Sequence, residues 1–112
     1  MKIVKDTLSL QELRKMAVDS FGNLVKAVVD VDRGLIALDA ELHSDLEALL
    51  LENGSRQESL WGVNLYPETK PDEFIEFDSM INMRPSFGNR SRGVDDEVTR
   101  KKIAKVVAER IK

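Results

Sequence analysis

The sequence predicts an α+β fold in which a mainly antiparallel four-stranded sheet, built from two hairpins, carries three helices packed on one face. Two observations lead to this prediction. Two pairs of segments are rich in β-branched residues or alternate apolar with polar residues, as half-buried strands do. Three other segments combine helix-start signals with apolar residues at helical spacing. Because 112 residues suit one core and no repeat or linker interrupts them, we expect residues 1–112 to form a single domain.

The N-terminal part of the chain is predicted to contain a short strand followed by a helix. The strand covers residues 2–5. Ser9 and Glu12 have the spacing of a capping box, which places the start of the helix directly after Ser9. Gly22 then ends the helix, because glycine readily adopts the left-handed conformation found at helix C-termini.

Residues 25–32 and 35–41 are predicted to form the first hairpin. Both segments are rich in β-branched and aliphatic residues, and Gly34 in the connecting turn can supply a positive φ angle. The alternation places one set of side chains on the core side of the hairpin: Ala27, Val29, Val31, Ile36, Leu38 and Ala40.

The second half of the chain is predicted to contain a helix, a second hairpin and a last helix. Ser44 and Glu47 form a second capping-box pattern that predicts the next helix. Residues 61–66 and 75–84 each alternate apolar with polar side chains and are predicted to pair as the second hairpin. The last helix begins near Asp95, with acidic residues in its first turn and basic residues later, as the helix dipole favours. Its buried stripe consists of Ile103, Val106, Val107 and Ile111.

Composition limits the classes of protein to which the chain can belong. It is 42% hydrophobic and 33% charged, which is ordinary for a globular protein. No segment approaches the ~20 apolar residues that span a bilayer, and the N-terminus has no apolar signal segment. We therefore expect a cytoplasmic protein without membrane contact. The absence of cysteine excludes a disulfide framework, a thiolate zinc site and a thiol nucleophile.

Charge is distributed unevenly along the chain. Residues 1–83 carry 8 basic and 16 acidic groups, whereas residues 84–112 carry 9 basic and 4 acidic groups. The net charge of −3 disfavours bulk nucleic-acid binding, although RNA or DNA binding through the basic C-terminal block stays an alternative. The favoured interpretation is that a basic helix complements its own acidic domain.

The sheet face opposite the predicted core is unusually acidic. It would present Asp30, Asp39, Glu41, Asn64, Tyr66, Glu76, Asp78, Asn82 and Arg84. Converging carboxylates could hold Mg²⁺ or supply a general acid and base, but the solvent face of an antiparallel sheet is polar in any case, and this second interpretation is favoured. His43 is the only histidine, and a hydrogen-bonding or packing role is favoured for it over catalysis.

The clearest local feature is the arginine-rich segment 84–93, which leads into the last helix. Its guanidinium groups and the free amides of a helix N-terminus could bind a phosphate or carboxylate. The candidate ligand-binding residues are Arg84, Asn89, Arg90, Arg92, Asn82 and Asp78, and no metal ligand is assigned. In the other interpretation, which is slightly favoured, the arginines neutralise the acidic face, most simply through Arg84 with Asp78 or Glu76.

Residues 60–67, 75–85 and 89–94, together with Glu41-Leu42-His43, carry a family resemblance. In these segments the chain resembles a family of short uncharacterised prokaryotic proteins, a domain of unknown function. The resemblance covers most of the chain and implies one domain. It implies no activity, substrate, cofactor or catalytic residue.

The leading hypothesis is a non-catalytic cytosolic binding or interaction module that uses the arginine-rich segment and the neighbouring polar sheet face. Its partner would be another protein, a second copy of the chain or an anionic ligand. The first alternative is a metal-assisted hydrolase or phosphate-ligand enzyme with Asp39, Glu41, His43 and Asp78 as ligands or bases. The second alternative is the RNA- or DNA-binding protein already mentioned. The sequence does not indicate a cofactor.

Overall fold

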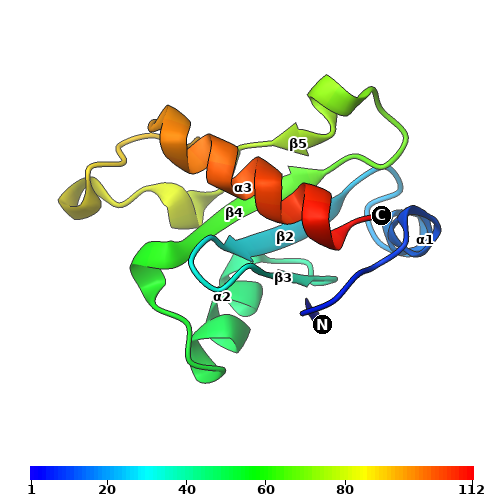
Figure 1. Cartoon of the computed structure of the whole chain (residues 1–112), viewed down its shortest axis with the longest axis horizontal. Helices are drawn as coiled ribbons and strands as arrows, with labels where there is room; N and C mark the ends of the chain where they lie inside the picture. The colour runs from blue at the N-terminus through cyan, green and yellow to red at the C-terminus, as the bar shows by residue number, and fades with distance from the viewer.

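A computed structural model describes residues 1–112 and contains three helices and one five-stranded sheet (Figure 1). The elements are β1 (Lys2–Val4), α1 (Leu10–Asp19), β2 (Val25–Asp30), β3 (Leu35–Leu38), α2 (His43–Glu52), β4 (Leu60–Leu65), β5 (Ile75–Glu76) and α3 (Glu97–Arg110). Short 3₁₀ turns occupy η1 (Gln57–Ser59), η2 (Pro71–Glu73), η3 (Met80–Asn82) and η4 (Pro85–Phe87). The predicted α+β class and antiparallel sheet are confirmed.

The strands are ordered β1-β3-β2-β4-β5, and all neighbours are antiparallel. The sheet has one strand more than predicted because the short N-terminal strand joins its edge beside β3. The predicted first hairpin is confirmed: Val29 pairs with Ile36, and Gly34 has a φ angle of 66° in the turn. Along β2 and β4 the register runs from Val25 opposite Leu65 to Asp30 opposite Leu60. The central strand is β2, with β3 and β4 on either side.

Helices cover both faces of the sheet rather than one. On the α3 face, Ala27 and Val29 pack with residues of α1 and α3 in the main core. On the opposite α2 face, Val28 and Ala37 pack with Leu46 and Leu50 of α2 in a second, smaller core. The uninterrupted apolar runs in β2 and β3 require this arrangement, because side chains that alternate across a strand bury both faces only when both are covered. Figure 1 shows α3 in front of the sheet and α2 below it.

The helix-start signals are confirmed at two of the three helices. Ser9 is the N-cap of α1, and its hydroxyl accepts a hydrogen bond from the Glu12 amide, as the capping box predicts. Asp96 caps α3 in the same way. The second predicted capping box does not form: α2 begins one residue before Ser44, at His43, and no side chain caps it. The His43 side chain instead bonds to the sheet, and this bond anchors the start of the helix.

The prediction of a strand over residues 75–84 is wrong beyond Glu76. The chain leaves the sheet after β5 and enters the η3 turn, where Ser79 Oγ accepts a hydrogen bond from the Ile81 amide. The Asn82 side chain then takes the place of a strand beside Gly62, through two hydrogen bonds with the Gly62 backbone. The side-chain amide of an asparagine offers the same hydrogen-bond donor and acceptor as a backbone peptide group, so it can replace a strand. The alternation of apolar and polar residues does not show whether the backbone or such a side chain pairs with β4.

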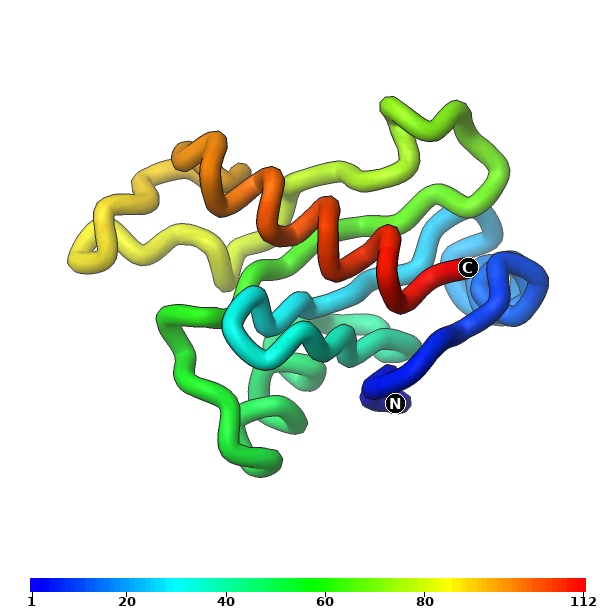
Figure 2. The backbone as a smooth tube through the Cα atoms, in the orientation of Figure 1, coloured from blue at the N-terminus to red at the C-terminus, as the bar shows by residue number.

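Backbone hydrogen bonds join the segment before α1 to the C-terminal end of the chain. The Leu8 amide donates to the Arg110 carbonyl at 2.7 Å, and the Lys112 amide donates to the Leu8 carbonyl at 2.9 Å. The tube in Figure 2 shows the C-terminus running beside the segment that leads into α1. No helix has both the length and the apolar character needed to cross a membrane.

Candidate functional site

The arginine loop, defined here as residues 80–92, projects from the body of the molecule between β5 and the start of α3. It is the yellow segment at the left of Figures 1 and 2. The loop consists of η3, η4 and a tight turn in which Gly88 has a φ angle of 85°. Across this turn Arg84 and Asn89 pair through their backbones, with N···O distances of 2.9 and 3.2 Å. All six candidate ligand-binding residues predicted from the sequence lie in this loop or beside it.

Asn82 joins the loop to the sheet and is fully buried. The Gly62 amide donates to Asn82 Oδ1 at 2.9 Å, while Asn82 Nδ2 donates to the carbonyls of Gly62 at 3.0 Å and Arg92 at 2.9 Å. One side chain therefore connects β4 to both ends of the loop. Its polar atoms are used in these bonds, so Asn82 holds the loop in place.

Asn89 has a similar role at the tip of the loop. Its Nδ2 donates to the Asn82 carbonyl and the Gly93 carbonyl, both at 2.8 Å, and its Oδ1 accepts from the Asp95 amide at 2.8 Å. The side chain is buried. These bonds hold the loop against the segment that leads into α3, and they give Asn89 a structural role. Its ligand role stays a prediction.

Arg84 points inward. Its guanidinium donates to the carbonyls of Gln57 and Leu60, and it stacks on the Trp61 ring at 4.6 Å from the centroid. Burial lowers the pKa of the Arg84 guanidinium below its ordinary value. The expected ion pair of Arg84 with Asp78 or Glu76 does not form, because the guanidinium is directed at the backbone carbonyls of η1 and β4.

The ion pair to the sheet is made by Arg92 instead. Its Nε lies 2.7 Å from Asp78 Oδ1, and both side chains are about half exposed. Asp95 accepts hydrogen bonds from Ser91 Oγ at 2.6 Å and from the Arg90 amide at 2.9 Å, which lower the pKa of its carboxyl. The Arg90 side chain is exposed and has no hydrogen bond or ion pair within the chain. Of the three arginines, Arg90 is therefore the one free to meet a partner.

Three large apolar side chains on the loop also face solvent. Met80 is 63% exposed, Met83 44% and Phe87 55%. A strand over residues 75–84 would place Met80 and Met83 on opposite faces, so the predicted alternation does not indicate this set. The strand ends at Glu76, and Met80 lies in η3. A signal was present in the composition of the segment, since methionine, aromatic and arginine residues together are typical of protein interfaces.

The polar sheet face beside α2 is a connected network. Glu76 Oε1 accepts hydrogen bonds from Asn64 Nδ2 at 2.8 Å and from the Tyr66 hydroxyl at 3.0 Å. Burial and the Glu76 carboxylate raise the pKa of the Tyr66 hydroxyl. The face stays acidic as predicted at Glu76 and Asp78, whereas Asp30 is fully buried and binds the Ser55 hydroxyl at 2.6 Å.

His43 sits at the start of α2, and its Nε2 lies 2.8 Å from the Val63 carbonyl. A carbonyl can only accept, so Nε2 carries the proton in this contact. Burial lowers the pKa of His43 below its ordinary value of 6.5. The predicted hydrogen-bonding role of His43 is confirmed. The ligand set considered for a metal-dependent hydrolase is not assembled, because no group of three or more histidine or acidic side chains is arranged to hold a metal ion.

A family model described as a protein of unknown function, DUF5674, matches residues 2–110. The chain therefore belongs to this family, which confirms the resemblance to an uncharacterised domain family. No curated protein and no solved structure matches the chain.

Proposed function

We propose that this member of DUF5674 is a non-catalytic, cytoplasmic protein-binding module whose partner contacts the arginine loop. One observation carries the proposal: a loop whose backbone is fixed by buried hydrogen bonds presents three large apolar side chains to solvent. A loop that only connects β5 to α3 has no need to expose Met80, Met83 and Phe87. Exposed apolar groups gathered on one element are typical of interaction surfaces.

The bracing of the loop supports this function on energetic grounds. Ordering a flexible loop on binding costs about 0.5–1.5 kcal/mol for each immobilised side chain. Asn82, Arg84 and Asn89 hold the backbone of the free protein in one conformation, so a partner does not have to order it. The two buried asparagines and the inward arginine thus contribute to binding indirectly, while the exposed side chains make the contacts.

The exposed groups also indicate what the partner surface offers. Phe87 needs an apolar pocket, and aromatic residues of this kind commonly dominate the binding free energy. Arg90 lies three residues further along the loop and has no ion-pair partner within the chain. An acidic group beside the pocket on the partner would therefore form an ion pair with it. We propose an acidic protein surface with one apolar pocket, and a second copy of this acidic chain is one protein with that charge.

The test compares single substitutions in a binding assay. Sedimentation over a range of concentrations measures self-association, and affinity capture followed by calorimetry with the recovered protein measures binding to other partners. Phe87→Ala should weaken the measured association at least tenfold, about 1.4 kcal/mol, and Arg90→Ala should weaken it more at low salt than at high salt. Val18→Ala removes an apolar side chain from α1 that is more exposed than Phe87, and it serves as the control.

Two results would overturn the proposal. If both loop variants bind as tightly as Val18→Ala, the contact surface lies elsewhere on the molecule. If the chain neither self-associates nor recovers a protein whose affinity depends on Phe87, the exposed apolar groups have no binding role.

A further inference from the structure

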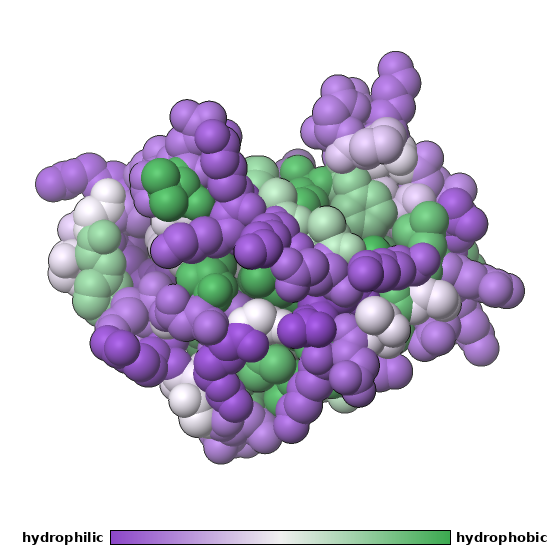
Figure 3. Space-filling view, in the orientation of Figure 1, coloured by the Kyte–Doolittle hydropathy of each residue, from purple (hydrophilic) through white to green (hydrophobic).

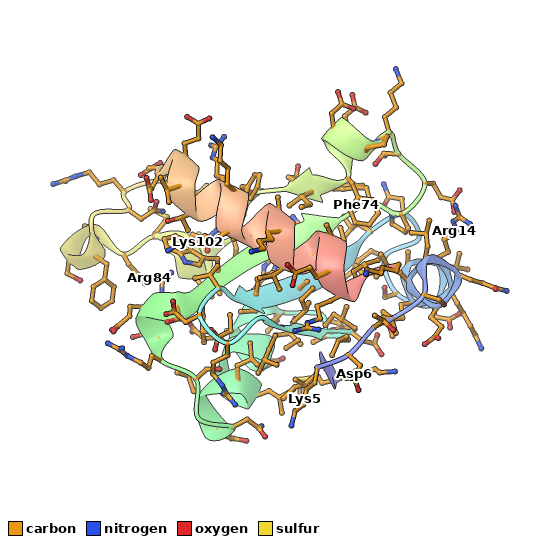
Figure 4. All side chains as sticks on the ribbon, viewed as in Figure 1. Lys5, Asp6, Arg14, Phe74, Arg84 and Lys102 are labelled. Carbon is orange, nitrogen blue, oxygen red and sulfur yellow. The ribbon has the colours of Figure 1, made fainter.

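An apolar groove lies at the far end of α3 from the arginine loop. It has a volume of about 460 Å³ and is formed between α1, the segment around η2 and the C-terminal half of α3. Its lining residues are Leu10, Arg14, Pro67, Thr69, Pro71, Phe74, Ile75, Ala104, Val107, Ala108, Ile111 and Lys112. Figure 3 shows apolar surface between α3 and the raised segment around η2, and Figure 4 shows Phe74 and Arg14 on this side of the molecule.

The groove exists because α3 places small side chains there. Ala104 and Ala108 are four residues apart, so they lie on the same side of the helix, where they line the groove. Larger apolar residues at these positions would fill the space and bury more apolar surface. The volume falls in the range of small-molecule sites, about 300–1,000 Å³, and the mostly apolar lining is also typical of them.

The charged groups of the groove are both cationic. Arg14 and Lys112 are the only charged residues among its lining residues. Arg14 forms an ion pair with Glu68, with 2.8 Å between Nε and Oε1, and both side chains are largely exposed. Such exposed pairs contribute little, about 0–1 kcal/mol, so a ligand carboxylate can replace Glu68 at small cost. The planar guanidinium also suits a carboxylate better than an ammonium would.

We propose that this groove binds a small amphipathic anion, with its apolar body along Ala104 and Ala108 and its carboxylate at Arg14. The apolar lining selects the body of the ligand, and Arg14 selects the charge and orients it. This site is separate from the arginine loop, because α3 has 14 residues and its opposite ends are about 20 Å apart. Failure of one proposal therefore leaves the other standing.

The test uses decanoate as the probe, below its micelle-forming concentration, in a nuclear magnetic resonance titration of the whole chain. Saturable shifts should appear at the amides of Ala104, Ala108 and Phe74. Decanol and decyltrimethylammonium have the same chain without the negative charge. Decanol should bind more weakly by up to about fivefold, which corresponds to about 1 kcal/mol, and the cationic probe should bind more weakly still. If decanoate causes no saturable shifts at these amides, or if the cationic probe binds as tightly, the proposal is wrong.

Two variants separate the two parts of the site. Ala108→Trp fills the groove and should abolish decanoate binding, whereas Ala48→Trp places the same bulk at an exposed position of α2 and should leave binding unchanged. Arg14→Gln should reduce the affinity for decanoate to that for decanol while leaving decanol binding as it was. Unfolding curves of each variant establish that it is folded. Unchanged decanoate binding by folded Ala108→Trp would place the ligand outside the groove and overturn the inference.

Discussion

Replacing Asn82 by alanine should destabilise the protein by about 3 kcal/mol. The substitution removes three hydrogen bonds, two with the Gly62 backbone and one with the Arg92 carbonyl. Each contributes roughly 1 kcal/mol net, and a buried amide left without a partner adds a penalty of about 1–3 kcal/mol that entering water reduces. A total near 3 kcal/mol is well below the ~5–15 kcal/mol stability of a typical domain, so the variant should still fold.

Urea unfolding provides the assay, and Trp61 provides the signal. Trp61 is the single tryptophan and lies under Arg84, so its fluorescence reports both global unfolding and the state of the arginine loop. Asn82→Asp is the informative companion, because it keeps an acceptor for the Gly62 amide and loses both donated bonds. Arg90→Ala, at an exposed side chain without a partner, should change stability by no more than about 0.5 kcal/mol.

A loss below about 1 kcal/mol for Asn82→Ala would refute this reasoning. It would mean that water replaces the asparagine amide without penalty, and hence that the loop is not held to β4 by this residue. An equal loss for Arg90→Ala would contradict the division of the loop into bracing and exposed residues.

Three further substitutions test neighbouring contacts. Gly62→Ala should cost about 1–3 kcal/mol in urea unfolding, because its Cβ would lie 2.5 Å from Ser79 Cβ, and adding Ser79→Gly should recover part of that loss. Arg84→Lys should cost about 2 kcal/mol and shift tryptophan emission, because an ammonium cannot bond two carbonyls and stack on the ring together. Burial lowers the pKa of His43, so the unfolded chain takes up a proton at a higher pH than the folded protein does. The contribution of His43 to the free energy of unfolding should therefore be constant above about pH 6.5 and should fall as the pH drops from there toward the lowered pKa. In urea unfolding measured at several pH values, His43→Gln should flatten this part of the profile.

The sequence predicts the fold well where local signals and tertiary packing agree. Ser9 caps α1 because a serine side chain can bond the amide three residues on in any context that permits a helix. The hairpin at Gly34 forms for an equally local reason. Ser44 has the same capping pattern and does not cap, since the neighbouring His43 bonds to Val63, which is 20 residues away in the sequence and lies on β4. A contact between distant segments is not visible in a local pattern.

The candidate site is predicted only in location. The arginine-rich segment stands out in the sequence, yet the roles of its residues depend on their depth in the folded chain. Arg84 and Arg90 are the same residue type six positions apart, and one is buried against Trp61 while the other is exposed. The asparagines are identified as braces only when Gly62 and Asp95 are placed beside them. Composition can find such a loop, but it cannot divide it into support and contact surface.

The way the sheet ends also limits how a partner can bind. An exposed strand edge can accept an extra strand from another protein through backbone hydrogen bonds, which tolerate many sequences. On the β5 side of β4, the Gly62 backbone is already paired with the Asn82 side chain, and β5 itself covers only Asn64 and Leu65. A partner bound at the arginine loop, as we propose, would therefore contact side chains of the loop rather than add a strand to β4. Single side-chain substitutions such as Phe87→Ala should then have large effects, which strand addition would not produce.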